Sequence, residues 1–249
     1  MKKLENKVAV ITGGNSGIGL ATAKLFAQEG AQVIITGRNE ETLDEAAGEI
    51  GHGAKAFLSD VSKIADLATL YKNIAESVGK IDILVLNAGN SYNVPIENFT
   101  EEMFDNIANT NYKGVFFSIQ KAMPFLADGG SVIITASTMA DKGAPNSIAY
   151  SSSKAAARAM ARGFAAALAP RNIRVNALSP GLVVTPLYQR TGTPQEQIDK
   201  RIDSLVAITP LKRVGTLEEI AKGFLFLASE DATFMTGAEL LLDGGFRSI

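Results

Sequence analysis

Seven short apolar runs, rich in β-branched residues, recur along the 249-residue chain. Their positions are 8–12, 33–36, 55–58, 83–86, 131–135, 173–177 and 239–242. Most of these runs lack alternating polar positions, which is typical of strands covered by helices on both faces. The segments between them are long enough for crossover helices. We therefore predict an α/β fold with a doubly wound, seven-stranded parallel sheet and helices on both faces.

Two helix starts carry recognisable capping signals. Thr216 is followed three residues later by Glu219, which is the spacing of a capping box. Thr193, Pro194 and Glu196 supply a cap, a first-turn proline and a box residue for another helix. Both helices are therefore expected to begin at these positions.

The chain shows no internal repeat, low-complexity segment or linker that would separate domains. Because α/β folds of about 200–250 residues often form one domain, we expect a single domain over residues 1–249. One long insertion, residues 186–213, places apolar side chains on a mostly polar background: Leu187, Tyr188, Ile198, Ile202, Leu205 and Val206. We interpret it as an amphipathic substrate lid, and the alternative is a surface elaboration that packs on its own strand.

Composition and charge narrow the setting of this fold. The 24 basic and 26 acidic residues give a net charge of −2 and form no basic stripe, so nucleic acid is not an expected partner. The absence of cysteine excludes disulfides, thiolate nucleophiles and cysteine metal sites, and it fits a reducing compartment. No apolar stretch reaches the roughly 18 residues of a membrane helix, and polar residues 5–7 interrupt any signal-peptide core. We expect a soluble cytoplasmic protein.

A glycine-rich turn joins the first predicted strand to a segment with helical periodicity. Glycine lets the backbone turn tightly and approach a pyrophosphate, whose charge is met by amide groups and the positive end of the helix dipole. The spacing differs from G-x-G-x-x-G, but the strand-to-helix context favours a Rossmann-type dinucleotide site over a plain tight connection. The turn supplies these candidate cofactor-binding residues: Gly13, Asn15, Ser16, Gly17, Ile18 and Gly19.

The end of the second strand bears on which cofactor is bound. About twenty residues beyond the glycine turn, a dinucleotide fold for NAD usually places an acidic residue on the ribose hydroxyl. Gly37 and Arg38 stand there instead. A guanidinium can pair with a 2′-phosphate that an acid would repel, so Arg38 favours NADP(H), with NAD(H) as the alternative. The other interpretation of Arg38 is a solvated surface charge.

Tyr150 and Lys154 lie four residues apart at the start of an alanine-rich helix. Positions i and i+4 share one helix face with Cβ atoms about 6 Å apart, so an ammonium group would stabilise a phenolate and lower the tyrosine pKa from about 10. Ser137 follows the fifth predicted strand. The only histidine, His52, lies between two glycines in a predicted turn, which makes it a poor acid–base candidate.

Six motifs appear in order along nearly the whole chain: Thr12-Gly13-x-x-x-Gly17-Ile18-Gly19, Asn87-Ala88-Gly89, Asn111, Ser137, Tyr150-x-x-x-Lys154 and Pro180-Gly181. At these residues the chain resembles the short-chain dehydrogenase/reductase family. A lone Y-x-x-x-K pair is a weak signal, but six ordered motifs are specific. Two departures are Leu86, where many relatives have a second asparagine, and Asn15-Ser16, where many NADP-dependent relatives carry an arginine.

The resemblance implies a role for each catalytic candidate. Tyr150 would be the general acid–base, and Lys154 would hold the nicotinamide ribose and lower the tyrosine pKa. Ser137 would hydrogen-bond the substrate oxygen, and Asn111 would support Lys154 through its main chain and an ordered water. By the same resemblance, Asp60 and Val61 would contact the adenine, and Thr185 would hold the carboxamide of the nicotinamide. The other residues that would line the cofactor are Asn87, Ala88, Gly89, Pro180, Gly181 and Val183.

The expected activity is hydride transfer between NADP(H) and a carbonyl or secondary-alcohol substrate, without a metal. The alternatives are a non-catalytic dinucleotide sensor or scaffold, and a family member that uses NAD(H) on a sugar or cyclic alcohol. The loops expected to form the substrate pocket offer Tyr92, Met139, Pro145 and Tyr188, a mixed apolar set. The insertion also carries five cationic residues: Arg190, Lys200, Arg201, Lys212 and Arg213. They would either attract an acidic carrier or be solvated surface charges, and we favour the second interpretation.

The resemblance also implies an oligomer. The helix expected over residues 150–169 is crowded with alanine, which permits close helix approach but also simply favours a stable helix. Relatives commonly pair this helix with the one spanning residues 101–126 and use the last strand near residues 241–245 to complete the assembly. We therefore expect a homotetramer.

Overall fold

The computed structural model describes residues 2–189 and 194–249. Its centre is a seven-stranded sheet in the order β3-β2-β1-β4-β5-β6-β7, and every neighbouring pair is parallel. The strands are β1 Val8–Thr12, β2 Gln32–Gly37, β3 Lys55–Leu58, β4 Ile81–Leu86, β5 Leu126–Thr135, β6 Arg174–Pro180 and β7 Glu239–Leu242. The predicted doubly wound fold is confirmed, and several strands extend beyond the predicted apolar runs.

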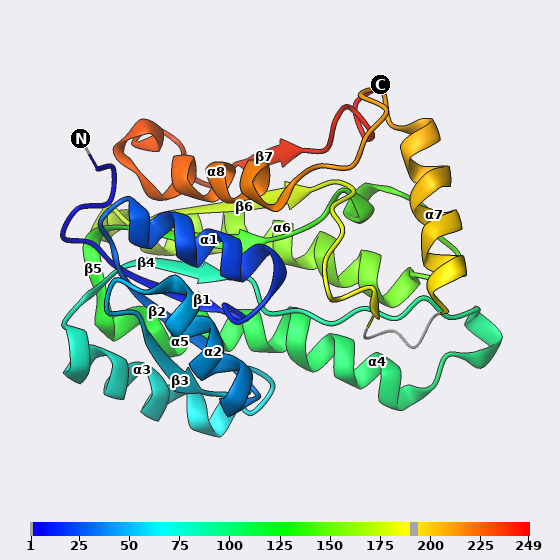
Figure 1. Ribbon diagram of the computed structural model, residues 1–249. Coiled ribbons are helices and arrows are strands. Elements are labelled where there is room, and N and C mark those ends of the chain that lie inside the picture. The colour runs from blue at the N-terminus through cyan, green and yellow to red at the C-terminus, as the bar shows by residue number, and fades with distance from the viewer. Residues whose placement is uncertain (1, 190–193) are drawn as a thin grey trace.

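Helices cover both faces of this sheet (Figure 1). One layer contains α1 Gly17–Gln28, α2 Glu40–Ile50 and α8 Leu217–Ala228. The other contains α3 Ile64–Val78, α5 Val115–Ala122 and α6 Ile148–Leu168, with α4 Glu101–Ile107 beside α6. The remaining long helix, α7 Gln195–Ile208, stands beyond the end of the sheet toward which the strands point.

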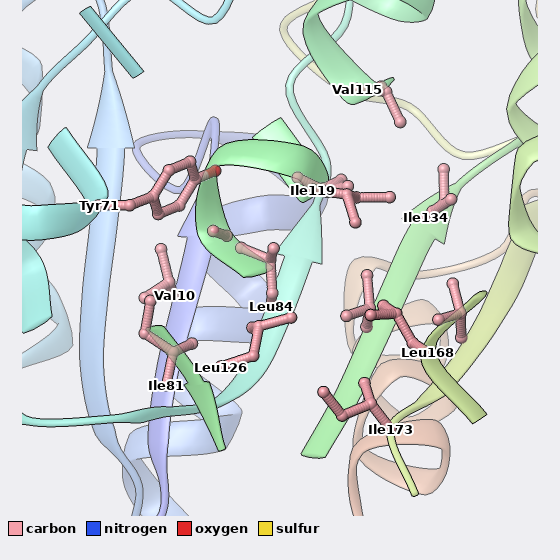
Figure 2. Close-up of a cluster of buried hydrophobic side chains, with 14 of the residues drawn as sticks. Val10, Tyr71, Ile81, Leu84, Val115, Ile119, Leu126, Ile134, Leu168 and Ile173 are labelled. Carbon is pink, nitrogen blue, oxygen red and sulfur yellow. The ribbon is translucent and has the colours of Figure 1, made fainter. Parts of the chain in front are cut away.

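Alternate positions of each central strand feed the two hydrophobic cores. Val10 and Leu84 point toward the layer of α3, α5 and α6, as Figure 2 shows, whereas Ile11 and Val85 point toward α1, α2 and α8. These four side chains are fully buried, and the burial of each contributes about 1.5–3 kcal/mol to the free energy of unfolding. Burial also raises the pKa of Tyr71, a fully buried member of the first core, to about 12.

The helix expected over residues 101–126 is interrupted. α4 passes at Ala108 into a π-helix, Ala108–Gly114, which continues as α5 and ends in a 3₁₀ turn, Met123–Phe125. The π-helix lies against α6, and a Cβ on Gly114 would meet the carbonyl oxygens of Asn109 and Val61 at 2.9 Å. The widened turn thus depends on tertiary packing, which periodicity does not report.

The two predicted helix starts have different outcomes. The capping box is confirmed at α8, where the Glu219 amide donates to Thr216 Oγ1 at 3.1 Å and the Thr216 amide donates to Glu219 Oε2 at 2.8 Å. α7 begins at Gln195, so Pro194 occupies the cap position and not the first turn. Thr193, the expected cap, lies outside the described residues.

Candidate active site

The candidate site is a pocket at the carboxyl ends of the strands, where the loops after β1, β4, β5 and β6 converge. In an open parallel sheet this edge is where ligands bind, next to the point at which strand order reverses, here between β1 and β4. The lining includes most of the predicted cofactor residues: Gly13, Asn15, Ser16, Gly17, Ile18, Asn87, Ala88, Gly89, Tyr150, Lys154, Pro180, Gly181, Val183 and Thr185.

The glycines of the turn after β1 occupy positions where other residues would be strained. Gly13 and Gly17 have φ values of +63° and +53°, a region that other residues rarely adopt. A Cβ on Gly19 would lie 2.2 Å from the carbonyl oxygen of Gly13, so only glycine lets α1 pack this closely on the turn. The cradle is therefore open to a phosphate group at the N-terminal end of α1.

Asn87 locks the same turn to the end of β4. Its Nδ2 donates to the carbonyl oxygens of Thr12 and Gly13 at 3.3 and 3.2 Å, while its amide donates to Thr12 Oγ1 at 3.0 Å. The Ala88 amide also donates to Thr12 Oγ1, at 3.1 Å. Asn87 thus lines the pocket and also holds together the ends of β1 and β4, between which the pocket opens.

Three of the predicted adenosine-side residues, Arg38, Asp60 and Val61, lie outside the pocket lining. Arg38 is exposed directly after β2, and Asn15, from the glycine turn, donates to Thr42 Oγ1 of the adjoining α2 at 2.8 Å. Asp60 accepts bonds from the amide and hydroxyl of Ser62. Val61 is buried. Their contacts with a cofactor remain predictions.

The catalytic candidates converge at the other end of the pocket. Ser137 caps the 3₁₀ turn Thr138–Asp141, and its hydroxyl also hydrogen-bonds Tyr150 at the start of α6. Lys154, one turn further along α6, places Nζ 5.8 Å from the centre of the Tyr150 ring. The ammonium group donates to the Thr135 carbonyl at 2.8 Å. The predicted juxtaposition of these three side chains is present.

Burial dominates the protonation of both residues of the pair. It lowers the pKa of Lys154 to about 8 because the ammonium form loses hydration. It also raises the pKa of Tyr150, and the hydrogen bond from Ser137 only partly offsets this rise. In the protein alone, desolvation of the phenolate therefore leaves the pKa of Tyr150 above its usual value, and the effect of Lys154 on it stays a prediction.

Asn111 lies in the middle of the π-helix and does not line the pocket. Its Nδ2 donates to the Asn90 carbonyl at 2.9 Å and to Ser153 Oγ at 3.1 Å, and its Oδ1 accepts from the Asn90 amide at 2.8 Å. A Cβ on Gly89 would lie 3.4 Å from Asn111 Oδ1 and 3.5 Å from Lys154 Nζ. Asn111 thus joins the loop after β4 to α6 directly behind the lysine.

The substrate side of the pocket differs in part from the sequence interpretation. Met139 and Tyr188 line it, but Tyr92 and Pro145 do not. Tyr92 turns away, accepts a bond from Asn106 at 2.9 Å and stacks edge-on with Phe99. Sequence reasoning missed Phe246, which arrives from the C-terminal segment. No local pattern marks it, since its place depends on the path of the chain after β7.

A short bridge joins the two segments that flank the insertion. Val183 pairs with Gly215 in an isolated parallel bridge, and the Gly215 amide donates to the Leu182 carbonyl at 2.9 Å. Between these residues, α7 presents one face to the pocket. Arg190, one of the cations considered from sequence, lies outside the described residues.

Comparison with known proteins shows the family of this chain. A family model described as Enoyl-(Acyl carrier protein) reductase matches residues 13–247. The chain is 36% identical over 249 residues to 3-oxoacyl-(acyl-carrier-protein) reductase FabG of Thermotoga maritima, covering 98% of both proteins. It belongs to the short-chain dehydrogenase/reductase family. It is also 40% identical over 251 residues to an oxidoreductase of Sarocladium schorii, covering 100% of this chain and 99% of that one.

Solved structures of the short-chain dehydrogenase/reductase family share the fold. One, described as short-chain dehydrogenase/reductase SDR: glucose/ribitol dehydrogenase of Brucella melitensis, superimposes with a TM-score of 0.92 at 34% identity, covering 99% of both chains. The protein is thus an oxidoreductase of a family that binds nicotinamide dinucleotides. The glycine cradle fits the phosphates of such a dinucleotide, because Gly13 has no side chain. A Cβ there would lie 3.0 Å from the Ala88 backbone and would narrow the cradle.

Two further observations concern residues 2–189 and 194–249. No helix there is long and apolar enough to cross a membrane. In the same part of the chain, no group of three or more His, Cys, Asp or Glu side chains is placed to hold a metal ion.

Proposed function

We propose that this oxidoreductase transfers a hydride between NADP(H) and a carbonyl or secondary-alcohol substrate, with Tyr150 as the general acid–base. One observation carries the proposal: the hydroxyls of Ser137 and Tyr150 meet in the pocket, with Lys154 beside them and the glycine cradle at the far end. The family relation supports the reaction class, and the name of the Thermotoga maritima relative describes a reductase of an oxoacyl group.

In the reductive direction, a nicotinamide cofactor held by the glycine cradle would supply the hydride for the carbonyl carbon. Negative charge then grows on the carbonyl oxygen. Ser137 donates a hydrogen bond to that oxygen, and Tyr150 donates the proton that completes the alcohol. The raised pKa of Tyr150 keeps the hydroxyl protonated before the reaction, as a proton donor requires. In the oxidative direction, the tyrosinate accepts the alcohol proton.

Lys154 supplies a positive charge next to the Tyr150 ring. Its bond to the Thr135 carbonyl fixes Nζ close to the Tyr150 ring. When Tyr150 gives up its proton, the buried ammonium group stabilises the resulting phenolate, because charges interact strongly where water is excluded. Asn111 holds the neighbouring loop and α6 in place through Asn90 and Ser153, so we assign it a positioning role.

The preference for NADP(H) rests on Arg38. It is exposed at the carboxyl end of β2, where a guanidinium can reach a 2′-phosphate, and no described carboxylate forms an ion pair with it. Glu40 and Glu41 in the first turn of α2 act against this preference. Arg38→Asp is expected to reverse the ratio of kcat/KM for the two cofactors.

The proposal is tested by two substitutions in the pair. Tyr150→Phe keeps the ring but removes the transferable proton, so turnover should fall by at least about 10²-fold while cofactor binding survives. Lys154→Met removes the charge and should weaken both turnover and cofactor binding. The assay is a panel of carbonyls and alcohols with each cofactor, followed at the absorbance of reduced nicotinamide. Near-normal rates in Tyr150→Phe would overturn the mechanism.

A further inference from the structure

α7 turns one face toward the catalytic residues. The side chains that line the pocket are Gln197, Ile198, Arg201 and Leu205, at positions i, i+1, i+4 and i+8. Residues with this spacing share one side of a helix. Arg201, in the middle of that side, is half-buried. A guanidinium therefore lines the pocket beside the apolar Ile198 and Leu205 and the polar Gln197.

The charges of the pocket are unbalanced. Among the described residues that line it, the only charged side chains are Lys154 and Arg201, and none is acidic. Lys154 lies beneath Tyr150 and is bonded to the Thr135 carbonyl. Within the described ranges, no carboxylate lies within ion-pair distance of Arg201. A half-buried guanidinium without a carboxylate partner is free to pair with a bound anion.

The other described cations of the insertion have protein partners outside the pocket. Lys200 pairs with Glu196 at 2.7 Å, and Arg213 pairs with Glu219 at 2.7 Å. Lys212 donates to the Ala207 carbonyl at 2.6 Å. The interpretation of the insertion cations as surface charges suits these three residues. It does not suit Arg201, which alone among the four faces the reacting groups.

Arg201 also acts on the acid–base residue itself. Its charge pulls down the pKa of Tyr150 and of Tyr188, although burial leaves both values raised. An interaction of this kind requires the guanidinium to lie near the two phenolic hydroxyls. Arg201 therefore lines the end of the pocket that holds Tyr150 and Tyr188.

We propose that the substrate is an anionic oxo compound, or the corresponding hydroxy compound, whose carboxylate or phosphate pairs with Arg201 while its carbonyl meets Tyr150 and Ser137. The inference rests on the proposed function. A guanidinium binds either anion through two parallel hydrogen bonds, which fixes orientation as well as affinity. Leu205, Met139 and Phe246 line the same pocket and suit a short aliphatic segment between the two polar groups.

The test compares substrates that differ only in charge. One pair is 3-oxobutanoate and its methyl ester, and a second is dihydroxyacetone phosphate and dihydroxyacetone, so that the two pairs distinguish a carboxylate from a phosphate. The wild type should favour the anion of at least one pair. Arg201→Gln should lower kcat/KM for that anion on the order of 10- to 100-fold and alter the neutral partner by only a few-fold. Arg201→Lys should recover part of the loss.

Lys200→Gln is the matched control, because it makes the same change of charge on the neighbouring residue, whose side chain pairs with Glu196 in solvent. It should leave the anion preference unchanged. The fluorescence of bound NADPH measures cofactor affinity in each variant. Equal wild-type rates on both members of both pairs would overturn the inference. So would a loss in Arg201→Gln that is equal for all substrates, or one that follows weakened NADPH binding, since Arg201 would then serve the cofactor.

Calorimetry separates this inference from the proposed function. If no carbonyl is reduced, the proposed function fails, but butanoate and butanamide can still be titrated into the protein with NADP⁺ present. Binding of butanoate that exceeds that of butanamide and is lost in Arg201→Gln would support the anion site. Equal binding of the two, or no binding of either together with none of inorganic phosphate, would overturn it.

Discussion

At the scale of single residues, Tyr150 and Lys154 both lose hydration, and each is driven toward its neutral form. The tyrosine pKa rises and the lysine pKa falls to about 8. The pair is thus set for proton donation before a substrate arrives. Negative charge that forms nearby favours the ammonium state of Lys154 again, because an opposite charge stabilises the ionised form. Turnover in this site therefore couples the two protonation equilibria.

Gly19 tests the glycine cradle. In Gly19→Ala, the new Cβ would lie 2.2 Å from the backbone oxygen of Gly13, where no flexible side chain can move away. We expect a loss of at least about 1–3 kcal/mol in the free energy of unfolding and weaker cofactor binding. Urea denaturation and NADPH titration measure the two effects.

Gly48→Ala is the matched control for that substitution. Gly48 is exposed inside α2, and a Cβ there meets nothing within 4 Å. Alanine in a helix interior should stabilise the protein by about 0.5–1 kcal/mol. A Gly19→Ala variant as stable as Gly48→Ala would show that the turn is not as closely packed as the structure indicates.

At the scale of elements, an ion-pair network joins four segments around the pocket. Arg158 of α6 donates to both oxygens of Asp141 in the 3₁₀ turn at 2.5 and 2.6 Å, and to Glu239 of β7 at 3.2 Å. Arg247 of the C-terminal segment pairs with the same two carboxylates, at 2.8 and 2.7 Å. The network thus ties the turn that carries Ser137 to the segment that brings Phe246 to the pocket.

This network makes stability depend on acid pH. The hydrogen bond from Arg158, followed by the charges of Arg158 and Arg247, holds the pKa of Asp141 below its usual value. A carboxyl whose pKa is lower in the folded state contributes stability above its unfolded pKa of 3.8, and this contribution disappears as the pH falls through the folded pKa. Asp141→Asn should therefore cost about 1 kcal/mol at neutral pH, after allowance for solvent screening, and nothing at the lowest pH.

Thermal unfolding of the wild type and Asp141→Asn between pH 2 and 7 measures this difference. The two stability curves should converge toward acid pH. Glu49→Gln is the control, because Glu49 pairs with Lys24 in solvent. Parallel curves for wild type and Asp141→Asn would contradict the contribution of the carboxylate.

At the scale of the whole molecule, we propose a homotetramer. Phe104 and Tyr112 are about half exposed, and Phe116 is 40% exposed; all three lie along the α4–α5 segment that packs beside α6. Phe116 contacts Phe164 of α6 with ring centres 5.3 Å apart. Exposed aromatic side chains that gather on neighbouring helices indicate an interaction surface, and the alanine-rich α6 permits close approach of a second copy.

Phe116→Arg should disrupt this surface. A charge at the centre of an apolar interface would be desolvated without a partner, so the assembly should shift toward dimers or monomers. Light scattering during size-exclusion chromatography measures the mass. Ala68→Arg, on the exposed side of α3, adds the same charge elsewhere and should leave the mass unchanged. A stable wild-type monomer would overturn the proposal.

The sequence by itself determined the sheet, its layers and the cofactor cradle. Strand β1 has the bounds of its apolar run, because burial on both faces demands unbroken apolar residues. The cradle was visible because only glycine tolerates the positive φ of Gly13 and the close packing at Gly19. The order of the catalytic motifs indicates the family for the same reason, because each local constraint restricts the residue types that a position can hold.

Only the tertiary structure decided the environment of those residues. The π-helix around Asn111 depends on packing against α6, and the direction in which Arg201 points depends on how α7 lies over the pocket. Phe246 enters the site from far along the chain. The protonation of Tyr150 could not be predicted from its spacing to Lys154, because a pKa depends on desolvation by the whole surrounding structure, and spacing fixes only the neighbouring charge.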